Sequence, residues 1–490
     1  MAEIALDKLL YRLLCGTPGE FRFSPGPVPS GEVIFPDPVS VYVHIPFCHS
    51  LCPFCPYTKM LYEAGLAAHY SHALEVEARR VLADLDGKKI SSVYFGGGTP
   101  LTLLDSVESV LALMSGHLTS GAEVAVEVHP HDINPAAVER LALAGVNMVS
   151  LGVESLDNAV LAGIGRNHSA EDALSALHTL MDCGRFSINV DLMTAIPGQS
   201  RESAVSDMLM LMKSGVDQVS TYPLMDFAFT RMKTRLSLLE QYRLLRDLAS
   251  AAEHAGYLRT SVWTWTKPGS RKYSSITRED YVGIGAGAAS HLGRCFWVNT
   301  FDVGAYVDAV DGAHPGDCAR GTVVVGDRSA CFMERPAIAG GEPNGFTERA
   351  AIVLNNLAGS DGIPAVAGDS LTVAEREAAV AEAADSERVS PVAVSIRMDD
   401  RQSALYRLFW RCYEGEFDLD SREALAVPIL RRLVRVAEAL RLVARSSSTV
   451  RLTERGFFMY HLLERYYTRK YIGRLWRHCR QSAFPREIVL

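Results

Sequence analysis

The sequence lacks the features that would place it among membrane, secreted or disulfide-rich proteins. No apolar run approaches the roughly eighteen residues that a membrane-spanning helix needs, and the start, MAEIALDKLLYRLL, is amphipathic and not a secretory signal. Ten cysteines among 490 residues are too few for a disulfide framework. With 49 Lys and Arg against 57 Asp and Glu, the net charge is −8, so no overall basic field attracts nucleic acid or anionic lipid. We therefore expect a cytoplasmic protein with neither a membrane nor a nucleic-acid partner.

What is present is the composition of an ordinary folded protein. Of the residues, 48% are hydrophobic and 22% are charged, which is enough to build a sizeable core. A chain of this length is expected to hold one large domain and at least one smaller one. We predict four parts, an N-terminal segment (1–37), a barrel (38–300), a linker or insertion (301–395) and a C-terminal helical domain (396–490).

Short β-branched runs alternate with stretches of helical period from about residue 39 onward. This alternation is typical of a mostly parallel sheet with crossover helices. Six βα units favour an α/β fold with an open, partial (β/α)6 TIM-like barrel over a closed eight-stranded one. The six predicted strands are 39–45, 90–95, 122–128, 147–153, 187–193 and 217–222.

The pattern changes after the sixth strand. The stretch YVGIGAGAASHLG is expected to be a Gly/Ala-rich turn, and residues of about 316–395 have weak periodicity, which indicates an insertion or a linker. Helical patterns return in 403–413, 428–443 and 454–476, with a short strand and turn at 449–456. The order helix, helix, strand, helix predicts a small, mainly helical, winged-helix-like domain.

Three of the ten cysteines are clustered. In YVHIPFCHSLCPFCPYTK, Cys48, Cys52 and Cys55 follow the first predicted strand with the spacing Cys-x3-Cys-x2-Cys. A zinc knot is one interpretation, but structural zinc takes four ligands and only His44 and His49 lie nearby. Three thiolates on a four-iron cluster leave one iron free to bind another molecule. The spacing therefore favours an iron–sulfur cluster over zinc.

This motif resembles that of the radical S-adenosylmethionine (SAM) enzymes. The wider string is similar to the HemN-like family of oxygen-independent coproporphyrinogen III oxidases, in which Tyr-x-His-Ile-Pro-Phe-Cys opens the site. The resemblance implies a 4Fe-4S cluster and SAM as cofactors, with SAM bound by the open iron and cleaved to a 5′-deoxyadenosyl radical. It also implies a small-molecule substrate and an external electron donor such as flavodoxin or ferredoxin.

The second predicted strand ends in a run of glycines, Gly96-Gly97-Gly98-Thr99-Pro100. Because glycine has no side chain, the backbone there can approach a ligand closely, although a tight strand-to-helix turn would need the same residues. The resemblance assigns this run to the SAM amino group.

Charged residues follow later strands at the same predicted edge of the sheet. Glu127 ends the third strand, Glu154 ends the fourth and Asp191 lies in the fifth. Each alone is compatible with an ordinary ion-paired carboxylate, but a sulfonium and two ribose hydroxyls together need carboxylates. Arg166 either pairs with a SAM carboxylate or is a surface arginine.

The resemblance further implies two SAM molecules. Tyr42, Gly97 and Glu127 would contact the one on the cluster, and the residues for the second would be Phe54, Gly98, Thr99, Glu154, Arg166 and Asp191. The aromatic rings of Tyr42 and Phe54 would also suit a core. Ala289 is a further candidate for cofactor binding, and Tyr42, Glu154 and Arg166 are the candidate catalytic residues.

The sequence also departs from the resemblance. Coproporphyrinogen oxidases usually carry another cysteine two residues after the third, where this chain has Tyr57. HemN-like proteins include decarboxylases, class C methyltransferases and cyclopropanases, and haem chaperones or haem-cleaving members. We expect methyl or methylene transfer from a second SAM to a small molecule or natural product, with coproporphyrinogen decarboxylation or haem handling as the alternatives.

The C-terminal part is locally basic and aromatic. A nucleic-acid-binding role would fit residues such as Arg431, Arg435, Arg469, Tyr467 and Trp476. A solvated helix face with core aromatics explains the same pattern, because acidic residues dilute the charge. We expect this region to cover the substrate at the barrel mouth, as the resemblance implies, and a haem carrier without radical turnover is a third possibility.

Overall fold

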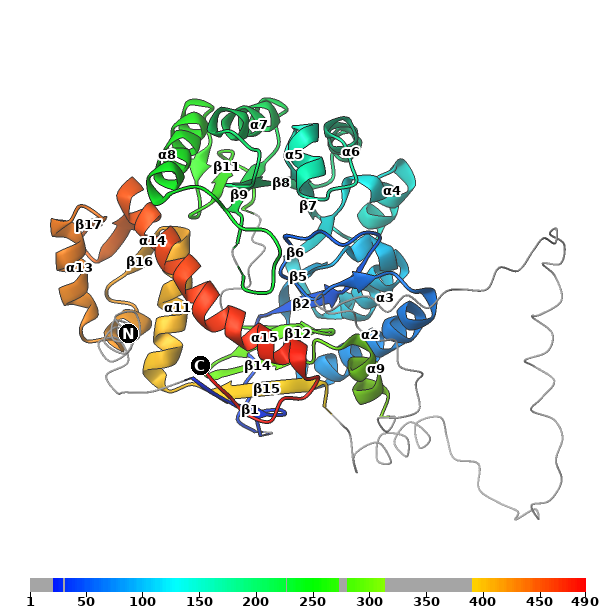
Figure 1. The fold of residues 1–490 in the computed structure, drawn as a ribbon. Coiled ribbons are helices and arrows are strands. Elements are labelled where there is room, and N and C mark those ends of the chain that lie inside the picture. Colours follow the sequence, from blue (N-terminus) through cyan, green and yellow to red (C-terminus); the bar gives the residue numbers. More distant parts are fainter. Residues whose placement is uncertain (1–20, 30, 226, 273–279, 313–389) are drawn as a thin grey trace, which may run out of the picture. The chain divides into compact units, whose positions relative to one another are not determined.

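Parallel strands linked by helices build the central sheet of the computed structural model (Figure 1). The structure describes residues 21–29, 31–225, 227–272, 280–312 and 390–490. All six strands predicted from the sequence are present in it. They are β2 (Val39–Ile45), β5 (Ile90–Gly97), β6 (Leu118–Val128), β7 (Met148–Glu154), β8 (Ser187–Thr194) and β9 (Gln218–Pro223). The predicted partial α/β barrel is therefore confirmed.

These strands lie side by side in chain order, and each pairs in parallel with the next. Parallel pairing brings their carboxyl ends to one edge of the sheet, where barrel enzymes keep their functional groups. The alternate side chains that point outward from the strands are mostly Val, Ile and Leu, and they form the main buried core with the helices.

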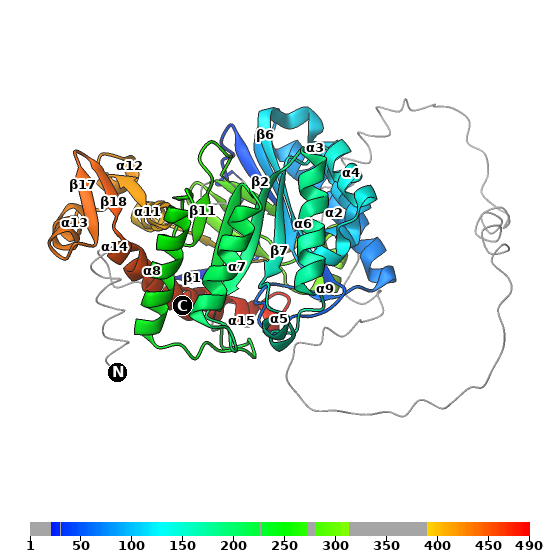
Figure 2. The same ribbon diagram turned by 90° about the horizontal axis from the view of Figure 1, so that it is seen from above.

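Helices follow most of these strands and line the outer side of the sheet (Figures 1 and 2). Helix α6 (Ala170–Cys183) shows how the sequence sets their ends, because Ser169 and Asp172 form a reciprocal capping box and Gly184 ends the helix at a φ of 64°. The short α5 (Asn158–Gly163) was not predicted. The predicted helices are α2 (Ala64–Asp84), α3 (Leu104–Met114), α4 (Pro135–Leu143), α6 (Ala170–Cys183), α7 (Arg201–Lys213) and α8 (Leu238–His254).

The Gly/Ala-rich stretch after the sixth strand is not a simple turn, and that expectation was wrong. It contains β12 (Tyr281–Ile284), which pairs in parallel with β2, and β13 (Ala289–Leu292), which returns antiparallel. A Cβ on Gly283 would meet the Ala289 carbonyl oxygen at 2.2 Å, so the close approach of the two strands requires glycine there. Small residues with low strand propensity hid these strands from the sequence pattern.

The sheet continues beyond β13 with antiparallel strands from both ends of the chain. They are β14 (Cys295–Asn299), β15 (Val392–Arg397), β1 (Arg22–Pro25) and β19 (Ile488–Val489), and they were not predicted. Helix α9 (Val303–Asp311) follows β14. At the other edge, β11 (Thr264–Thr266) pairs antiparallel with β9 and with β10 (Leu258–Arg259).

The C-terminal residues form the expected winged-helix-like arrangement. A three-stranded sheet of β16 (Glu416–Asp418), β18 (Thr449–Leu452) and β17 (Val443–Ser446) packs with three helices around its own apolar core. These helices are α11 (Asp400–Glu414), α12 (Arg422–Leu425) and α13 (Leu430–Ala439). The predicted last helix is divided into α14 (Glu454–Tyr467), a π-helical turn (Thr468–Ile472) and α15 (Gly473–Gln481).

Most of the predicted linker, 301–395, and most of the N-terminal segment, 1–37, lie outside the described residues. The four domain boundaries therefore stay a prediction. Within the described ranges, no helix has both the length and the apolar character that a membrane span requires.

Candidate active site

The cysteine loop leaves the carboxyl end of β2 and is fixed by the glycine run that ends β5. Cys48 lies in the short strand β3 (Phe47–Cys48), which pairs with β4 (Met60–Leu61). Gly98 N–H donates to the Ile45 carbonyl at 2.7 Å, and Thr99 N–H donates to the Phe47 carbonyl at 2.8 Å. Backbone hydrogen bonds thus hold the two loops together just before Cys48.

The three loop cysteines are free thiols close enough to act on one another. Cys48 is buried, and burial raises its pKa to about 12 even though the Thr99 side chain offsets part of the effect. Cys52 and Cys55 are partly buried, and both add to the rise at Cys48. Lys59 lowers the pKa of Cys48 and Arg166 lowers that of Cys52, so both cations oppose the effect of burial. Lys59 Nζ donates to the Cys55 carbonyl, and Arg166 Nη1 lies 3.9 Å from Cys52 Sγ.

The glycine run leaves no room for side chains. A Cβ on Gly97 would lie 2.6 Å from the His44 ring, and the Gly97 φ of +117° is one that other residues rarely adopt. A Cβ on Gly98 would lie 2.7 Å from the Phe47 carbonyl oxygen and 2.9 Å from Cys48 Sγ. Glycine is therefore required at position 97 by the His44 ring and its own φ angle, and at position 98 by the backbone of Pro46 and Phe47, whether or not a ligand is bound.

Glu127, at the end of β6, faces the glycine run. Its Oε1 accepts a hydrogen bond from the Tyr94 hydroxyl at 2.5 Å, and its Oε2 accepts one from Gly97 N–H at 3.1 Å. Burial raises the pKa of this carboxyl group, while both donors oppose the rise. Glu127 thus joins β5 to β6 at the edge of the sheet that carries the cysteines.

Arg166 and Glu154 form a buried charged pair beside Cys52. Arg166 Nη1 lies 3.9 Å from Glu154 Oε1, and their side chains are only 9% and 14% exposed. Arg166 Nη2 donates to the Gly152 carbonyl at 2.5 Å, while its buried Nε has no partner among the described residues. Glu154 has a φ of 66°, a strained value for a residue with a side chain. The pair is therefore held in place, and Arg166 Nε remains available to donate a hydrogen bond to a ligand.

Asp191, in β8, lies within a polar network inside the barrel. Its two carboxylate oxygens accept hydrogen bonds from the Ser150 hydroxyl at 2.6 Å and from Asn189 Nδ2 at 2.8 Å. Burial raises the pKa of Asp191 to about 7, and the charges of Glu154 and Glu127 add to the rise. The three carboxyl groups predicted from the sequence therefore share one electrostatic environment.

The remaining predicted residues are less closely connected. The Tyr42 hydroxyl lies 2.8 Å from His44 Nδ1, and its ring packs near Tyr94. Phe54 packs against a small apolar cluster that includes Val160 and Ile164. Ala289 begins β13, in the antiparallel part of the sheet.

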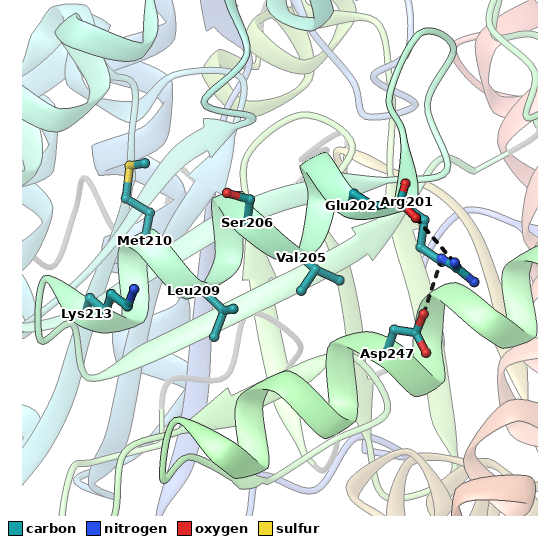
Figure 3. Close-up of a pocket in the computed structure, with 8 residues that line it drawn as sticks. All are labelled: Arg201, Glu202, Val205, Ser206, Leu209, Met210, Lys213 and Asp247. Carbon is teal, nitrogen blue, oxygen red and sulfur yellow. Dashed lines mark hydrogen bonds and ion pairs between the residues drawn. The ribbon is translucent and has the colours of Figure 1, made fainter.

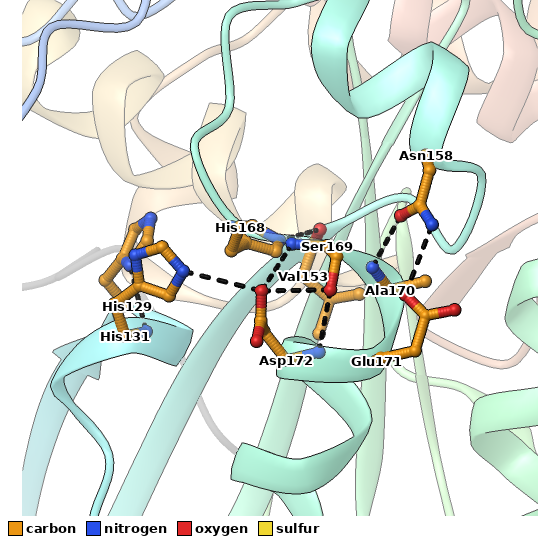
Figure 4. Close-up of polar contacts among 9 residues, drawn as sticks. All are labelled: His129, His131, Val153, Asn158, His168, Ser169, Ala170, Glu171 and Asp172. Atoms are coloured by element: carbon orange, nitrogen blue, oxygen red, sulfur yellow. Dashed lines mark hydrogen bonds and ion pairs between the residues drawn. The ribbon is translucent and has the colours of Figure 1, made fainter.

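A histidine group adjoins Arg166 and was missed by the sequence analysis (Figure 4). The ring centroid of His129 lies 5.3 Å from that of His131 and 5.1 Å from that of His168. His168 Nε2 lies 3.1 Å from the Val153 carbonyl oxygen, and His131 Nε2 lies 3.5 Å from Asp172 Oδ2. Burial, and next the charge of Arg166, lower the pKa of His129 to about 2 and that of His168 to about 4. Both imidazoles are thus neutral at pH 7 and do not repel Arg166.

His44, Tyr94 and Ser150 were also missed as partners of the predicted residues. His44 is buried with a pKa lowered to about 4, and its Nε2 lies 2.9 Å from the Thr58 carbonyl oxygen. The alternation of side chains along a strand could have revealed two of these partners. His44 lies on the same face of β2 as Tyr42, and Tyr94 lies on the same face of β5 as Gly96.

A pocket lies on the outer helices α7 and α8, lined by residues other than those of the predicted site (Figure 3). Arg201 Nε forms an ion pair there with Asp247 Oδ2 at 3.2 Å, and the other lining residues are Glu202, Val205, Ser206, Leu209, Met210 and Lys213.

We call the cysteine loop and the groups around it the mouth of the barrel: the glycine run, Glu127, Glu154, Arg166 and Asp191. These residues fit the cofactors that the motif implies. Three thiols on one loop suit an iron–sulfur cluster, with Gly98 packed against Cys48, Arg166 near the Cys52 thiol and Lys59 bonded to the Cys55 carbonyl. Among the described residues, no three His, Cys, Asp or Glu side chains converge on a point that could hold a single metal ion. A cluster differs in this requirement, because each cysteine binds a different iron.

Comparisons with known proteins agree with this geometry. Residues 42–211 match the family model of the radical SAM superfamily. The chain is 30% identical to the heme chaperone HemW of Lactococcus lactis over 289 residues, which are 56% of this chain and 74% of that protein. It is 27% identical to the oxygen-independent coproporphyrinogen III oxidase of Bradyrhizobium diazoefficiens over 376 residues, 68% of this chain and 83% of that one.

Among solved structures, the fold is similar to that of coproporphyrinogen III oxidase (HemN) from Escherichia coli, with a TM-score of 0.66 at 18% identity. The match covers 92% of this chain and 95% of that one. This likeness extends the agreement in fold beyond the barrel to the C-terminal region.

Proposed function

Because this chain belongs to the family of radical SAM enzymes that includes the heme chaperone HemW and oxygen-independent coproporphyrinogen III oxidase, we propose that it acts on a tetrapyrrole. Its cofactors are a 4Fe-4S cluster and SAM, as in the rest of the superfamily. The observation that carries the proposal is that relatives in both groups, which match over the barrel, are named for haem or for a haem precursor.

Within this class we favour haem handling over decarboxylation. Tyr57 occupies the position where the decarboxylases usually have a further cysteine. Methyl or methylene transfer, our first expectation, gains no support from the names of the relatives and stays a prediction. The experiment below distinguishes all three reactions.

The residues of the mouth have distinct roles in this proposal. Cys48, Cys52 and Cys55 would hold the cluster through three of its irons, and the remaining iron would be open to SAM. When bound and reduced, the cluster supplies the electron that cleaves SAM to methionine and a 5′-deoxyadenosyl radical. The glycine run lets backbone groups approach the SAM amino group, and Glu127 accepts hydrogen bonds beside it.

The charged pair and Asp191 act on the rest of SAM. Arg166 has an unpartnered Nε that can donate to a SAM carboxylate, because Glu154 and Gly152 occupy only its terminal nitrogens. Glu154 and Asp191 offer carboxylate oxygens to ribose hydroxyls and to the sulfonium. Burial of these groups excludes water, which strengthens each interaction. A second SAM near Glu154 and Asp191 stays part of the proposal.

Tyr57 offers a surface for a planar macrocycle. The residue is 54% exposed, and its ring centroid lies 5.9 Å from that of Trp476 in α15. Stacking of aromatic rings contributes about 0.5–1.5 kcal/mol beyond the area buried. Tyr57→Ala should therefore weaken tetrapyrrole binding by about tenfold or less. Tyr62→Ala should not, although Tyr62 is also exposed and its ring meets Phe47 edge to face.

The test uses anaerobically reconstituted protein with SAM and a reductant. We would measure haem binding by absorbance titration, and 5′-deoxyadenosine, S-adenosylhomocysteine and porphyrin products by mass spectrometry. Haem handling predicts haem binding, no decarboxylated product and no S-adenosylhomocysteine. Deoxyadenosine formed with a decarboxylated porphyrin would establish the oxidase alternative.

Two outcomes would count against the tetrapyrrole itself. One is failure to bind either haem or coproporphyrinogen III while SAM is still cleaved. The other is S-adenosylhomocysteine that appears together with deoxyadenosine, which would restore methyl or methylene transfer. The Cys48→Ala variant gives the background of each assay.

A further inference from the structure

Helix α15, from the far end of the chain, reaches the cysteine loop. Arg480 Nη2 donates a hydrogen bond to the carbonyl of Pro56, the residue that follows Cys55. One helical turn earlier, the Trp476 ring lies against the Tyr57 ring. Two successive residues of the loop are thus contacted by a helix more than four hundred positions away in the sequence.

The Arg480 guanidinium is held between aromatic rings and, within the described part of the chain, has no acidic partner. Its central carbon lies 4.7 Å from the Phe229 ring centroid and 5.4 Å from that of Phe301. Among the described residues no carboxylate forms an ion pair with it, and its buried Nε has no hydrogen-bond partner. A cation that is desolvated and left unpaired is costly, so its positive charge acts on its surroundings with little screening.

Those surroundings are the cysteine loop. Burial lowers the pKa of Arg480, whereas the nearby Cys55 thiol raises it, and the guanidinium in turn lowers the pKa of His44. Lys59 and Arg166 contact Cys55 and Cys52 from within the barrel. Arg480 is therefore a third cation at the same loop, contributed by the C-terminal region.

A cation in this place has a defined effect on an iron–sulfur cluster. Reduction adds one negative charge to the cluster, so a nearby positive charge stabilises the reduced form more than the oxidised form. Net charge and burial around a cluster are among the factors that set its reduction potential. Removal of the cation should lower the potential and make the cluster harder to reduce.

We propose that Arg480 is a positioning residue that fixes the loop after Cys55 and raises the reduction potential of the cluster, so that helix α15 completes the cluster site. The proposal rests on the three cysteines as cluster ligands and not on the identity of the substrate. It gives the C-terminal region a role in setting the reduction potential of the cluster, in addition to its expected role of covering the mouth.

The test compares three variants in the full-length, anaerobically reconstituted protein. Arg480→Gln removes the charge, Arg480→Lys keeps it, and Arg477→Gln removes a charge from an exposed position on the same helix. The midpoint potential is measured by redox titration followed by electron paramagnetic resonance, with the iron content determined on each sample. We expect a more negative potential for Arg480→Gln, partial or full recovery for Arg480→Lys, and no shift for Arg477→Gln.

An Arg480→Gln protein with full iron content and the parental potential would overturn the proposal. If Arg480→Gln fails to retain the cluster, Arg480→Lys decides, since a lysine with the parental potential supports a role for charge. Loss of the cluster from both variants would show that only the guanidinium packing matters. A chain that binds no iron at all would instead refute the cysteine assignment.

Discussion

The mouth of the barrel and the outer groove on α7 and α8 both contain charged side chains, but they hold them differently. In the groove, Arg201 is 42% exposed and forms ion pairs with Asp247 and Glu202 at 3.2 and 3.3 Å. At the mouth, Arg166 and Glu154 are 9% and 14% exposed, 3.9 Å apart, and one buried nitrogen of Arg166 has no partner.

The two sets of charges differ in their exposure to solvent. Exposed pairs compensate one another and are screened by water, so they contribute little to stability or to binding. Desolvated charges with spare hydrogen-bonding capacity raise the energy of the free protein and gain most when a complementary ligand arrives. This contrast favours the mouth over the groove as the candidate site.

The largest effect should come from the cysteine loop. Cys48→Ala removes one of the three thiolates of the loop, at a buried position. Iron content and formation of 5′-deoxyadenosine should both fall to background. The control is Cys183→Ala, at the end of α6, which should keep both. Full turnover in Cys48→Ala would show that the cluster is held elsewhere.

Next in size is the buried pair at the mouth. Arg166→Gln leaves Glu154 unpaired, and loss of one partner from a buried pair costs about 3–5 kcal/mol where the remaining group stays charged. We expect a lower free energy of unfolding and a SAM affinity reduced by about tenfold or more, as befits the loss of a charge-assisted contact. Denaturant unfolding and SAM binding by calorimetry check both, and unchanged SAM affinity would leave Arg166 with a structural role only.

A substitution in the glycine run should have a smaller effect. The methyl group of Gly98→Ala would lie 2.7 Å from the Phe47 carbonyl oxygen and 2.8 Å from the Pro46 carbonyl carbon, which are backbone atoms that cannot rotate away. Overpacking of this kind costs about 1–3 kcal/mol. Gly116→Ala is the matched control, because its Cβ would meet nothing within 4 Å. Equal iron occupancy and equal melting temperature for the two variants would contradict the steric argument.

Asp191 predicts a pH dependence. Its pKa is raised from 3.8 to about 7 in the folded protein, so the folded state binds a proton that the unfolded chain has released. The stability from this group is fully present below pH 3.8 and is lost as the pH rises through 7. Asp191→Asn cannot titrate, so it should gain stability relative to the parent between pH 5 and pH 8. Denaturant unfolding of SAM-free protein across this range measures the trend, and a flat difference would show that the carboxyl group is not perturbed.

The sequence allowed the parallel half of the sheet and its site to be predicted because their signals are local. The β-branched runs, the spacing of Cys48 to Cys55 and the glycines after β5 each lie within a few residues. Carboxylates at the ends of parallel strands meet at one edge whatever the loops between them do, so Glu127, Glu154 and Asp191 could be placed together.

The antiparallel half and the contacts of α15 could not be predicted, because they join distant segments. Strand β1 pairs with β15 and β19 across more than three hundred residues, and no period in the sequence encodes such pairing. The contact of Arg480 with Pro56 is of the same kind. From the sequence alone, a basic helix face is as compatible with contact to solvent or nucleic acid as with contact to a cysteine loop.

The smallest effect should come from the outer groove. Arg201→Ala removes both ion pairs with Asp247 and Glu202, yet exposed pairs contribute only about 0–1 kcal/mol. The free energy of unfolding should therefore change by less than about 1 kcal/mol, and SAM cleavage should match that of the parent. Arg166→Gln is the matched removal of an arginine at the mouth. Arg201→Ala could instead impair SAM cleavage as much as Arg166→Gln does. In that case solvent exposure would not distinguish the groove from the mouth, and the groove would have to be treated as a second functional site.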